Sequence, residues 1–412
     1  MQSKAELTTS DHPASHSARS SRKHEFALPL VDHPIRFTTF LQAPLLAASF
    51  ILYSITQLPV SEPKMSQAYV PPAARLVGMK LPDGFFVIEA LIPKPHATGG
   101  NFSFGYIAEK DGQKFFLKAL DYSTALRSED PPFALQLLTQ AFLHERDVCF
   151  QCKSSRLTRV VLPVVAGTVE VDPSDPIGKV QYIIFEKADG DIRSAIVELE
   201  KFDIAWALRA LHGIAVALQQ LHGIGIAHQD VKPSNVLLFS SSFSKLSDLG
   251  RSSATSVTAL HDQFGIAGDP VYAPPELLYG AAPADWNTRR VGCDSYMFGN
   301  LISFFFCGAN LSSLLQQQLD PAHRAGSWSG SYAEALPYLV DGFGKVLNQL
   351  ERHFPSRFRA ELRGTLLELC HPDPTRRGRP TDGAVQQFSM KRYISRFDKL
   401  ARQAEFLLGR SK

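Results

Sequence analysis

The fold of this chain is decided by two stretches of sequence, Ile226-Ala227-His228-Gln229-Asp230-Val231-Lys232-Pro233-Ser234-Asn235 and Leu246-Ser247-Asp248-Leu249-Gly250. They set two carboxylates, a lysine and an amide in the order that metal-assisted phosphoryl transfer requires. Asp230 is placed to accept a proton from an attacking hydroxyl group, and Lys232 can neutralise charge on a transferred phosphoryl group. Asn235 and Asp248 offer oxygen ligands to Mg²⁺, a hard cation that prefers carboxylate and amide oxygens.

Two short runs with strand character lie between these groups. Residues 236–239 and 244–247 are separated by a polar turn, which predicts a β-hairpin that brings Asn235 and Asp248 to the same end. An Asp-x-Lys-Pro-x-Asn string could also be a plain surface turn, because Asp, Pro, Ser and Asn all favour turns. The second string of metal-ligand residues at hairpin distance argues against that interpretation.

The two stretches resemble the catalytic and metal-binding loops of the eukaryotic-type protein kinases, whose patterns are His-Arg-Asp-x-x-x-x-Asn and Asp-Phe-Gly. The resemblance implies an α+β, two-lobed fold, with a small β-rich N-lobe that carries one long helix and a larger, mainly helical C-lobe. It also implies that Asp230 and Lys232 are catalytic and that Asn235 and Asp248 hold the metal. In this family the histidine, here His228, packs under the loop without a chemical role.

A glycine-containing stretch upstream lies where the family has its loop over the ATP phosphates. Gly100 and Gly105 match the first and third glycines of that loop, whereas Phe102 occupies the second position. Phe104 matches the aromatic residue at the loop tip, and Ile107 follows on the next strand. The resemblance implies that Gly100, Phe104, Gly105 and Ile107 contact the nucleotide, although the stretch alone would indicate only a hairpin turn.

Lys118 stands alone in a short apolar run, and such a lysine usually points to solvent from an edge strand. Its distance after the glycine loop instead matches the lysine that contacts the α- and β-phosphates. Its acidic partner is expected on the amphipathic helix predicted over residues 134–152, where Glu145 is the best candidate and Asp147 a weaker one. Residues 121–133 read as an inserted loop between the two.

Residues 182–191 resemble the strand and hinge that join the two lobes. On that alignment Phe185 closes the back of the adenine pocket, and the backbone of Glu186 and Ala188 bonds the adenine edge. The alternative is an ordinary buried strand that ends in a glycine turn. The position between Lys118 and the catalytic loop favours the hinge.

Three downstream features resemble the scaffold of the C-lobe. Pro275-Glu276 looks like the end of the activation segment, and Asp294 begins a helix from which it would cap the catalytic-loop backbone. An Asp-Pro-x-x-Arg element supplies an arginine to pair with Glu276, and both Arg377 and Arg379 fit the pattern.

The chain departs from the family pattern beside the catalytic aspartate. Gln229 replaces the arginine that usually pairs with a phosphate on the activation segment, so that charge-based switch is expected to be absent. Asp269 replaces a threonine and would repel Asp230 unless Lys232 lies between them. Leu249 in place of phenylalanine is a milder change at a packing position.

Composition sets few further bounds. The chain of 412 residues is 44% hydrophobic, which is enough for a large core, and its net charge of +3 does not argue for nucleic acid or membrane as a partner. Five cysteines at irregular positions favour a reducing compartment without disulfides. Cys149 and Cys152 are expected to be core-facing thiols, because a zinc site would need two more ligands.

Residues 1–64 differ in composition and are expected to be disordered or a mis-called extension, with translation beginning at Met65. Residues 37–60 carry no charge, but polar and proline residues make them a poor membrane-spanning helix. A kinase-like domain is expected over residues 80–399, with its N-lobe at about 80–185 and its C-lobe at about 189–399. A helical tail is expected over 400–412, and residues 312–331 read as loop-rich.

Three functions follow from these patterns. The favoured one is a cytoplasmic protein kinase that uses ATP and Mg²⁺, with Mn²⁺ as an alternative, to phosphorylate Ser or Thr in proteins; Lys232 favours Ser/Thr over Tyr. A small-molecule kinase of the aminoglycoside or choline type shares the Asp-x-x-x-x-Asn pattern but generally lacks that lysine. A pseudokinase scaffold is the third, for which Phe102 and Asp269 are the arguments. Neither nucleic acid nor a membrane is expected as a partner, with anchoring through residues 37–60 the less favoured alternative.

Overall fold

The computed structural model of the protein describes residues 69–92, 102–198, 202–239, 243–383 and 386–409. All of them belong to one compact unit, Pro44–Lys412. The expectations for residues 1–64, including the apolar stretch 37–60 and a start at Met65, lie outside the described residues, and so does the expectation for Gly100.

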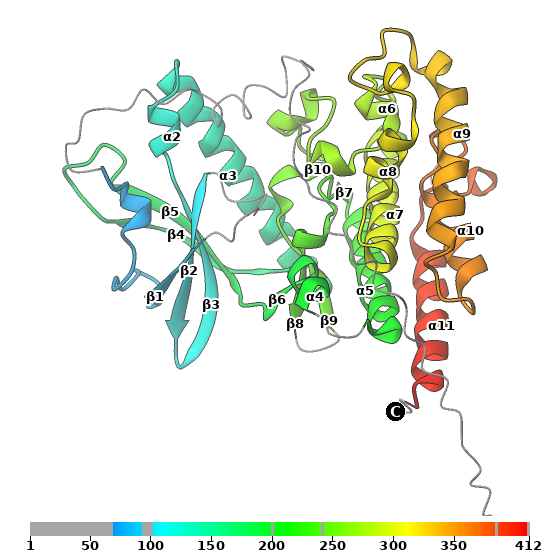
Figure 1. Ribbon diagram of the computed structural model, residues 1–412. Helices are drawn as coiled ribbons and strands as arrows, with labels where there is room; N and C mark the ends of the chain where they lie inside the picture. Colours follow the sequence, from blue (N-terminus) through cyan, green and yellow to red (C-terminus); the bar gives the residue numbers. More distant parts are fainter. Residues whose placement is uncertain (1–68, 93–101, 199–201, 240–242, 384–385, 410–412) are drawn as a thin grey trace, which may run out of the picture. The chain divides into compact units, whose positions relative to one another are not determined.

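A five-stranded antiparallel sheet, in the order β1-β2-β3-β5-β4, forms the N-terminal lobe (Figure 1). Its strands are β1 Phe86–Leu91, β2 Ser103–Lys110, β3 Gln113–Leu120, β4 Pro163–Glu170 and β5 Lys179–Glu186. Tyr106, Leu117 and Tyr182 are fully buried in the core of this lobe. Because side chains alternate along a strand, Lys118 points to the opposite face of β3 from Leu117.

The lobe begins earlier than the sequence indicated. The 3₁₀ helix η1, Pro72–Ala74, packs on the sheet through Ala73, and the Tyr106 hydroxyl donates a 2.5 Å hydrogen bond to the Ala73 carbonyl oxygen. Leu76 is fully buried in the same core. The core of this lobe thus includes residues before position 80, where the domain was expected to begin, because a proline-rich segment without periodicity contributes to it.

The one long helix of this lobe is α3, Pro131–Ser154. Asp130 accepts a hydrogen bond from Phe133 N and so satisfies one of the unpaired N–H groups at the helix start. The loop predicted over residues 121–133 was partly wrong, since it contains the short helix α2, Ser123–Leu126, and the first turn of α3. The core-facing stripe of α3 includes Leu138, Phe142 and Val148.

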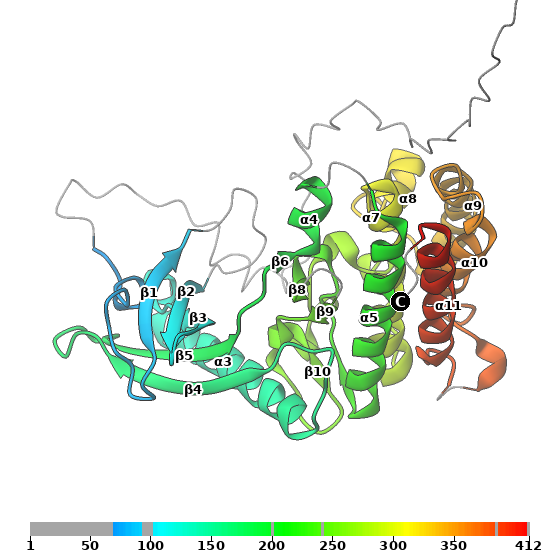
Figure 2. The same cartoon turned by 90° about the horizontal axis from the view of Figure 1, so that it is seen from below.

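Helices dominate the C-terminal lobe, and with the sheet they confirm the predicted α+β class (Figures 1 and 2). The α-helices are α4 Ile192–Glu198, α5 Ile204–Gly223, α6 Pro275–Leu278, α7 Gly292–Cys307, α8 Leu311–Gln318, α9 Tyr332–Glu351, α10 Arg359–Leu369 and α11 Lys391–Leu407. The short strands are β6 Gly190–Asp191, β7 Ile226–Ala227, β8 Val236–Phe239, β9 Phe243–Leu246 and β10 Ser253–Ala254. Short helical turns are η2 Pro233–Asn235, η3 Leu249–Arg251, η4 Leu260–Gln263, η5 Pro270–Tyr272, η6 Asn287–Val291, η7 Pro321–His323 and η8 Pro380–Asp382.

The last helix, α11, belongs to the C-terminal lobe along its whole length. It lies beside α5 (Figure 2), and Arg209 of α5 pairs with Asp398 at 2.8 Å and with Glu405 at 2.7 Å. The predicted boundary between residues 399 and 400 falls inside this continuous helix.

The stretch 312–331 is less irregular than expected. Helix α8 occupies its first part, and Asn310 caps that helix by accepting a 2.7 Å hydrogen bond from Ser313 N. The buried apolar residues of this helix, Leu311 and Leu315, are few, and the three glutamines that follow them gave no helical pattern in the sequence.

Over the residues that the structure describes, no single helix is long and apolar enough to cross a membrane. By length and composition alone, the bent pair Asn287–Cys307 and Leu311–Gln318 passes the same test.

All five cysteines are free. Cys149 and Cys152 lie on the buried side of α3, as predicted for core-facing thiols, and Cys293 and Cys370 are buried in the helical lobe, whereas Cys307 is partly exposed. Burial raises the pKa of all five thiols, and that of Cys152 reaches about 12.

Candidate active site

The backbone of the catalytic loop is hydrogen-bonded to a buried carboxylate on α7. Asp294 accepts hydrogen bonds from the backbone N–H groups of His228 and Gln229, both at 2.7 Å. It also lies 2.8 Å from Nε2 of His222, at the end of α5. Gln229 has a φ of 64°, which few non-glycine residues adopt, so these bonds hold the loop in an uncommon backbone conformation. The structure thus contains the backbone cap expected from Asp294.

Asp230 is held by three donors. Its Oδ1 accepts a 2.9 Å hydrogen bond from Asp269 N, and its Oδ2 lies 2.9 Å from both Asn235 Nδ2 and Lys232 Nζ. Lys232 Nζ is also 3.7 Å from Asp269 Oδ2. The lysine therefore lies between the two carboxylates, as the sequence required if Asp269 was not to repel Asp230.

The predicted β8–β9 hairpin sets the distance between the two metal-ligand candidates. Val236 pairs with Leu246 across the hairpin, and Ser247 N donates a 2.9 Å hydrogen bond to the Asn235 carbonyl oxygen. His228 lies beneath, with Nε2 2.9 Å from the Ser247 carbonyl oxygen. Asp248, the next residue, thereby leaves the hairpin at the same end as Asn235.

A second charged cluster joins the lobes. Lys118 Nζ lies 2.7 and 2.8 Å from the two carboxylate oxygens of Glu145, and 3.7 Å from Asp248 Oδ1. Burial alone would lower the pKa of Lys118, but Glu145 and Asp248 outweigh it and raise that pKa. Lys118 in turn lowers the pKa of Asp248. Both groups are therefore charged at neutral pH, and the expected Lys118–Glu145 ion pair is present.

Neighbouring strands bring together most of the residues expected near a nucleotide. Gly105 lies opposite Lys118 in the β2–β3 pair, and Phe104 and Ile107 are on the same strand, β2. Phe185, on β5, is buried against Phe116 with ring centroids 6.4 Å apart.

The hinge residues follow at the end of β5. The side chain of Glu186 pairs with Lys245 Nζ at 2.5 Å and accepts a hydrogen bond from Leu162 N, which fixes the strand end where Ala188 follows. This salt bridge ties the end of the N-terminal sheet to β9 of the hairpin.

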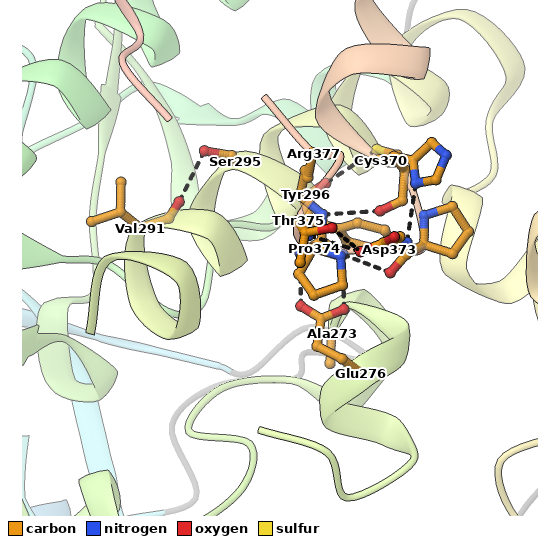
Figure 3. Close-up of polar contacts among 12 residues, drawn as sticks. Ala273, Glu276, Val291, Ser295, Tyr296, Cys370, Asp373, Pro374, Thr375 and Arg377 are labelled. Carbon is orange, nitrogen blue, oxygen red and sulfur yellow. Dashed lines mark hydrogen bonds and ion pairs between the residues drawn. The ribbon is translucent and has the colours of Figure 1, made fainter. Parts of the chain in front are cut away.

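The C-lobe scaffold has a fully buried ion pair. Arg377 Nη1 and Nη2 lie 2.7 and 2.8 Å from the two oxygens of Glu276, with side-chain exposures of 0% and 1% (Figure 3). Arg377 Nε also donates to the His371 carbonyl oxygen at 3.1 Å. Of the two arginines that fitted the pattern, Arg377 rather than Arg379 makes this pair.

Comparison with known proteins agrees with this geometry. The sequence matches the protein kinase domain family over residues 100–389, which is more than half of the chain. The chain belongs to the protein kinase family. It is 29% identical over 198 residues to CBL-interacting protein kinase 26 of Oryza sativa subsp. japonica, a match that covers 48% of this chain and 34% of that protein. The chain thus matches about a third of that relative's length.

The charge state of the kinase site fits a divalent cation. Asn235 directs its amide nitrogen to the Asp230 carbonyl oxygen and carboxylate, at 2.8 and 2.9 Å, which leaves the amide oxygen as its ligand atom. Asp248 is ionised, and its side chain is 40% exposed. Among the described residues, no group of three or more His, Cys, Asp or Glu could hold a metal by itself. A cation here would need oxygens from a phosphate as well.

Two sets of contacts in the kinase domain had no signal in the sequence. His144 of α3 and His261 of η4 each place Nε2 2.8 Å from the Ser252 carbonyl oxygen. A carbonyl oxygen only accepts, so both histidines donate, and together they tie α3 to the activation segment, residues 248–276. Burial lowers the pKa of His261 to about 4. The second set joins Gln229 to a buried arginine, Arg290.

Proposed function

We propose that this protein transfers the γ-phosphoryl group of MgATP to Ser or Thr hydroxyls of protein substrates. The observation that carries the proposal is the presence of Lys118, Asp230, Lys232, Asn235 and Asp248 in two bonded clusters, one that pairs Lys118 with Asp248 and one that joins Asp230 to Lys232 and Asn235. Every side chain that the family uses on phosphate and metal is retained.

The loop residues supply a fixed proton acceptor. Asp230 is turned by its bonds to Asp269 N, Asn235 and Lys232, so that its carboxylate is in place before a substrate arrives. The substrate hydroxyl oxygen bonds to the γ-phosphorus as the bond to the β-phosphate oxygen breaks, ADP leaves, and Asp230 takes the hydroxyl proton. Lys232 offsets negative charge on the transferred group.

The nucleotide and metal sites are proposed from these two clusters. Lys118, oriented by Glu145, would contact the phosphates, and Asn235 and Asp248 would hold Mg²⁺ or Mn²⁺, which when bound neutralises phosphate charge. The remaining nucleotide contacts are proposed for Gly100, Phe104, Gly105, Ile107, Phe185, Glu186 and Ala188.

Ser/Thr acceptors are favoured by Lys232, two residues after the proton acceptor, and the relative named above is itself described as a protein kinase. The buried Arg377–Glu276 pair argues against a small-molecule kinase, because that class generally lacks this scaffold. We place the activity in the cytoplasm, where ATP and reducing conditions coincide, without nucleic acid or membrane as partner.

A pseudokinase remains the competing function because of one contact. Asp269 shares Lys232 with Asp230, because Asp269 Oδ2 lies 3.7 Å from Lys232 Nζ. A lysine shared by two carboxylates is less available to a phosphoryl group.

The test is Mg²⁺-dependent transfer of labelled γ-phosphate by the full chain, with a generic protein acceptor and a small-molecule panel offered in parallel. Label on protein Ser or Thr, lost in Asp230→Ala and Asp248→Ala, would support the proposal. Label confined to a small molecule would move the protein to the second class. ATP binding without any transfer would identify a scaffold.

A further inference from the structure

A buried arginine occupies the space beside the catalytic loop. Arg290 lies in η6 and is 2% exposed. Its Nη1 donates a 3.2 Å hydrogen bond to Gln229 Oε1, and its Nη2 lies 3.0 Å from Asp262 Oδ1. One guanidinium thus bridges the residue before the catalytic aspartate and the middle of the activation segment.

The orientation of Gln229 is fixed by its other contacts. Its Nε2 donates to the Arg290 carbonyl oxygen at 2.8 Å and to Asp294 Oδ1 at 3.0 Å. The amide oxygen is therefore the atom that faces the guanidinium. An arginine at position 229 would set a second positive charge against Arg290, so the neutral side chain and the buried arginine belong together.

The Asp262 carboxylate joins two other positions of the activation segment to Arg290. Its carboxylate accepts hydrogen bonds from Ser253 Oγ and, at 2.7 Å, from Ala259 N, in addition to the Arg290 ion pair. Its carbonyl oxygen accepts from Arg289 Nη2 at 2.7 Å and from Arg290 Nη2 at 2.9 Å. The side chain is only 17% exposed, so these bonds are largely shielded from water.

We propose that Asp262 is a permanent anion that orders the activation segment through Arg290, so that this kinase needs no phosphate on that segment. Arg290 and Asp262 are positioning residues, which act through Gln229 and the catalytic loop. The inference rests on the proposed kinase function for its effect on rate, whereas the ordering of the segment stands on the contacts alone. A phosphate or a carboxylate can satisfy a guanidinium in the same way.

The hydroxyl groups of the segment agree with this assignment. Ser252 and Ser253 are fully buried, and Ser253 donates to Asp262. Thr255, Ser256 and Thr258 are exposed. The exposed hydroxyl groups are therefore separate from the buried guanidinium of Arg290, which is already paired with Asp262.

The first experiment removes the charge of Arg290 or of Asp262 and then restores a positive charge at position 229. Arg290→Gln and Asp262→Asn should each lower kcat for phosphoryl transfer roughly 10- to 100-fold, with KM for ATP unchanged, because a misplaced loop affects chemistry more than nucleotide binding. Gln229→Arg combined with Arg290→Gln returns a guanidinium beside Asp262 and should regain most of the lost rate. Arg363→Gln, which breaks the half-exposed pair with Glu351, is the matched control.

The second experiment removes phosphate from the wild-type protein. Phosphatase treatment, or alanine at Thr255, Ser256 and Thr258 together, should leave kcat within about twofold of the untreated enzyme. A loss of activity on dephosphorylation would overturn the proposal. So would unchanged kcat in Arg290→Gln, or a charge-relocated variant that is no better than Arg290→Gln although it folds.

Limited proteolysis separates failure of this inference from failure of the proposed function. Cleavage within residues 252–269 should be slow in the dephosphorylated wild-type protein and faster in Arg290→Gln and Asp262→Asn, whether or not the protein transfers phosphate. Equal cleavage in all three proteins would overturn the anchoring role. Protection in the wild type alone, without any phosphoryl transfer, would retain the anchor and reject only the kinase activity.

Discussion

Two ion pairs in this molecule join segments that are far apart in sequence, and they differ in their access to solvent. Arg377 and Glu276 are 0% and 1% exposed, and the guanidinium also donates to the backbone carbonyl oxygen of His371. Lys118 and Glu145 are 24% and 8% exposed, and Lys118 also faces Asp248.

The contrast separates a structural pair from a working pair. Arg377 is fully buried among its partners, so it can stabilise the fold but cannot contact a ligand. Lys118 is partly exposed and has two carboxylate neighbours, so it can exchange one of them for a phosphate. Removing the cation from ion pairs of different exposure should therefore affect either stability or activity, according to the exposure of the pair.

The largest expected effect is on stability at the sealed pair. Arg377→Met leaves Glu276 buried without its partner, which should lower the free energy of unfolding by about 3–5 kcal/mol. Urea denaturation followed by tryptophan fluorescence measures this loss. A loss below about 1 kcal/mol would break the comparison, because the sealed pair would then behave like an exposed one.

The open pair should respond in the opposite way. Lys118→Met should reduce γ-phosphoryl transfer about 100-fold, since a preorganised cation at the phosphates is lost. Its cost in stability should be smaller, about 1–2 kcal/mol, because water reaches this pair. Initial rates with labelled ATP and the same denaturation assay measure both quantities.

Lys114→Met is the matched control for that variant, because Lys114 is an exposed lysine on the same strand, β3. Wild-type transfer by Lys118→Met, or an equal loss in both variants, would show that the open pair does not serve the reaction.

The hydrogen bond from His261 to the Ser252 carbonyl oxygen lies at the interface between α3 and the activation segment. The pH dependence of stability tests whether protonation of His261 weakens that interface. The pKa of His261 is lowered by burial to about 4, whereas an unfolded histidine titrates near pH 6.5. The unfolded state therefore binds the proton first as pH falls. The stabilising contribution is complete above pH 6.5 and is lost progressively between pH 6.5 and 4, by about 2 kcal/mol at pH 5.

His261→Gln keeps an N–H group that can reach the Ser252 carbonyl oxygen and removes the titration. The variant should lose less stability than the wild-type protein between pH 7 and pH 5, as thermal melts across that range would measure. His353→Gln, at an exposed histidine, is the control. An unchanged pH slope in His261→Gln would reject the assignment.

The smallest effect is expected at a fully solvated pair. Asp341 and Lys345 lie one turn apart on α9, and their side chains are 66% and 56% exposed. Lys345→Gln should change the free energy of unfolding by less than about 0.5 kcal/mol, and 1 M salt should remove even that difference. A change larger than 1 kcal/mol would show that exposure does not rank these pairs.

The site was predictable where its chemistry is local in the chain. The catalytic loop, the hairpin and Asp248 are close in sequence, so their residue types and spacing sufficed to predict the geometry. Glu145 could be chosen as the partner of Lys118 because helical periodicity placed it on the inward face of α3.

The rest depends on contacts that no local pattern encodes. Arg377 and Arg379 were equivalent in sequence, and the turn at Gly378, with a φ of 72°, is what separates their directions. Arg290 reaches Asp262 and Gln229 only because η6 places it beneath the loop. The core contacts of η1, which precede the predicted domain start at residue 80, have a similar origin, since packing rather than a motif orders this segment.

The buried thiols can report on how the two lobes of this molecule unfold. Cys149 and Cys152 lie on the buried side of α3, the long helix of the N-terminal lobe, and Cys293 and Cys370 lie in the helical lobe. A thiol reagent can reach them only when the surrounding structure unfolds. Pulsed alkylation read by mass spectrometry would therefore reveal, without any engineered probe, whether the two lobes unfold together or one before the other.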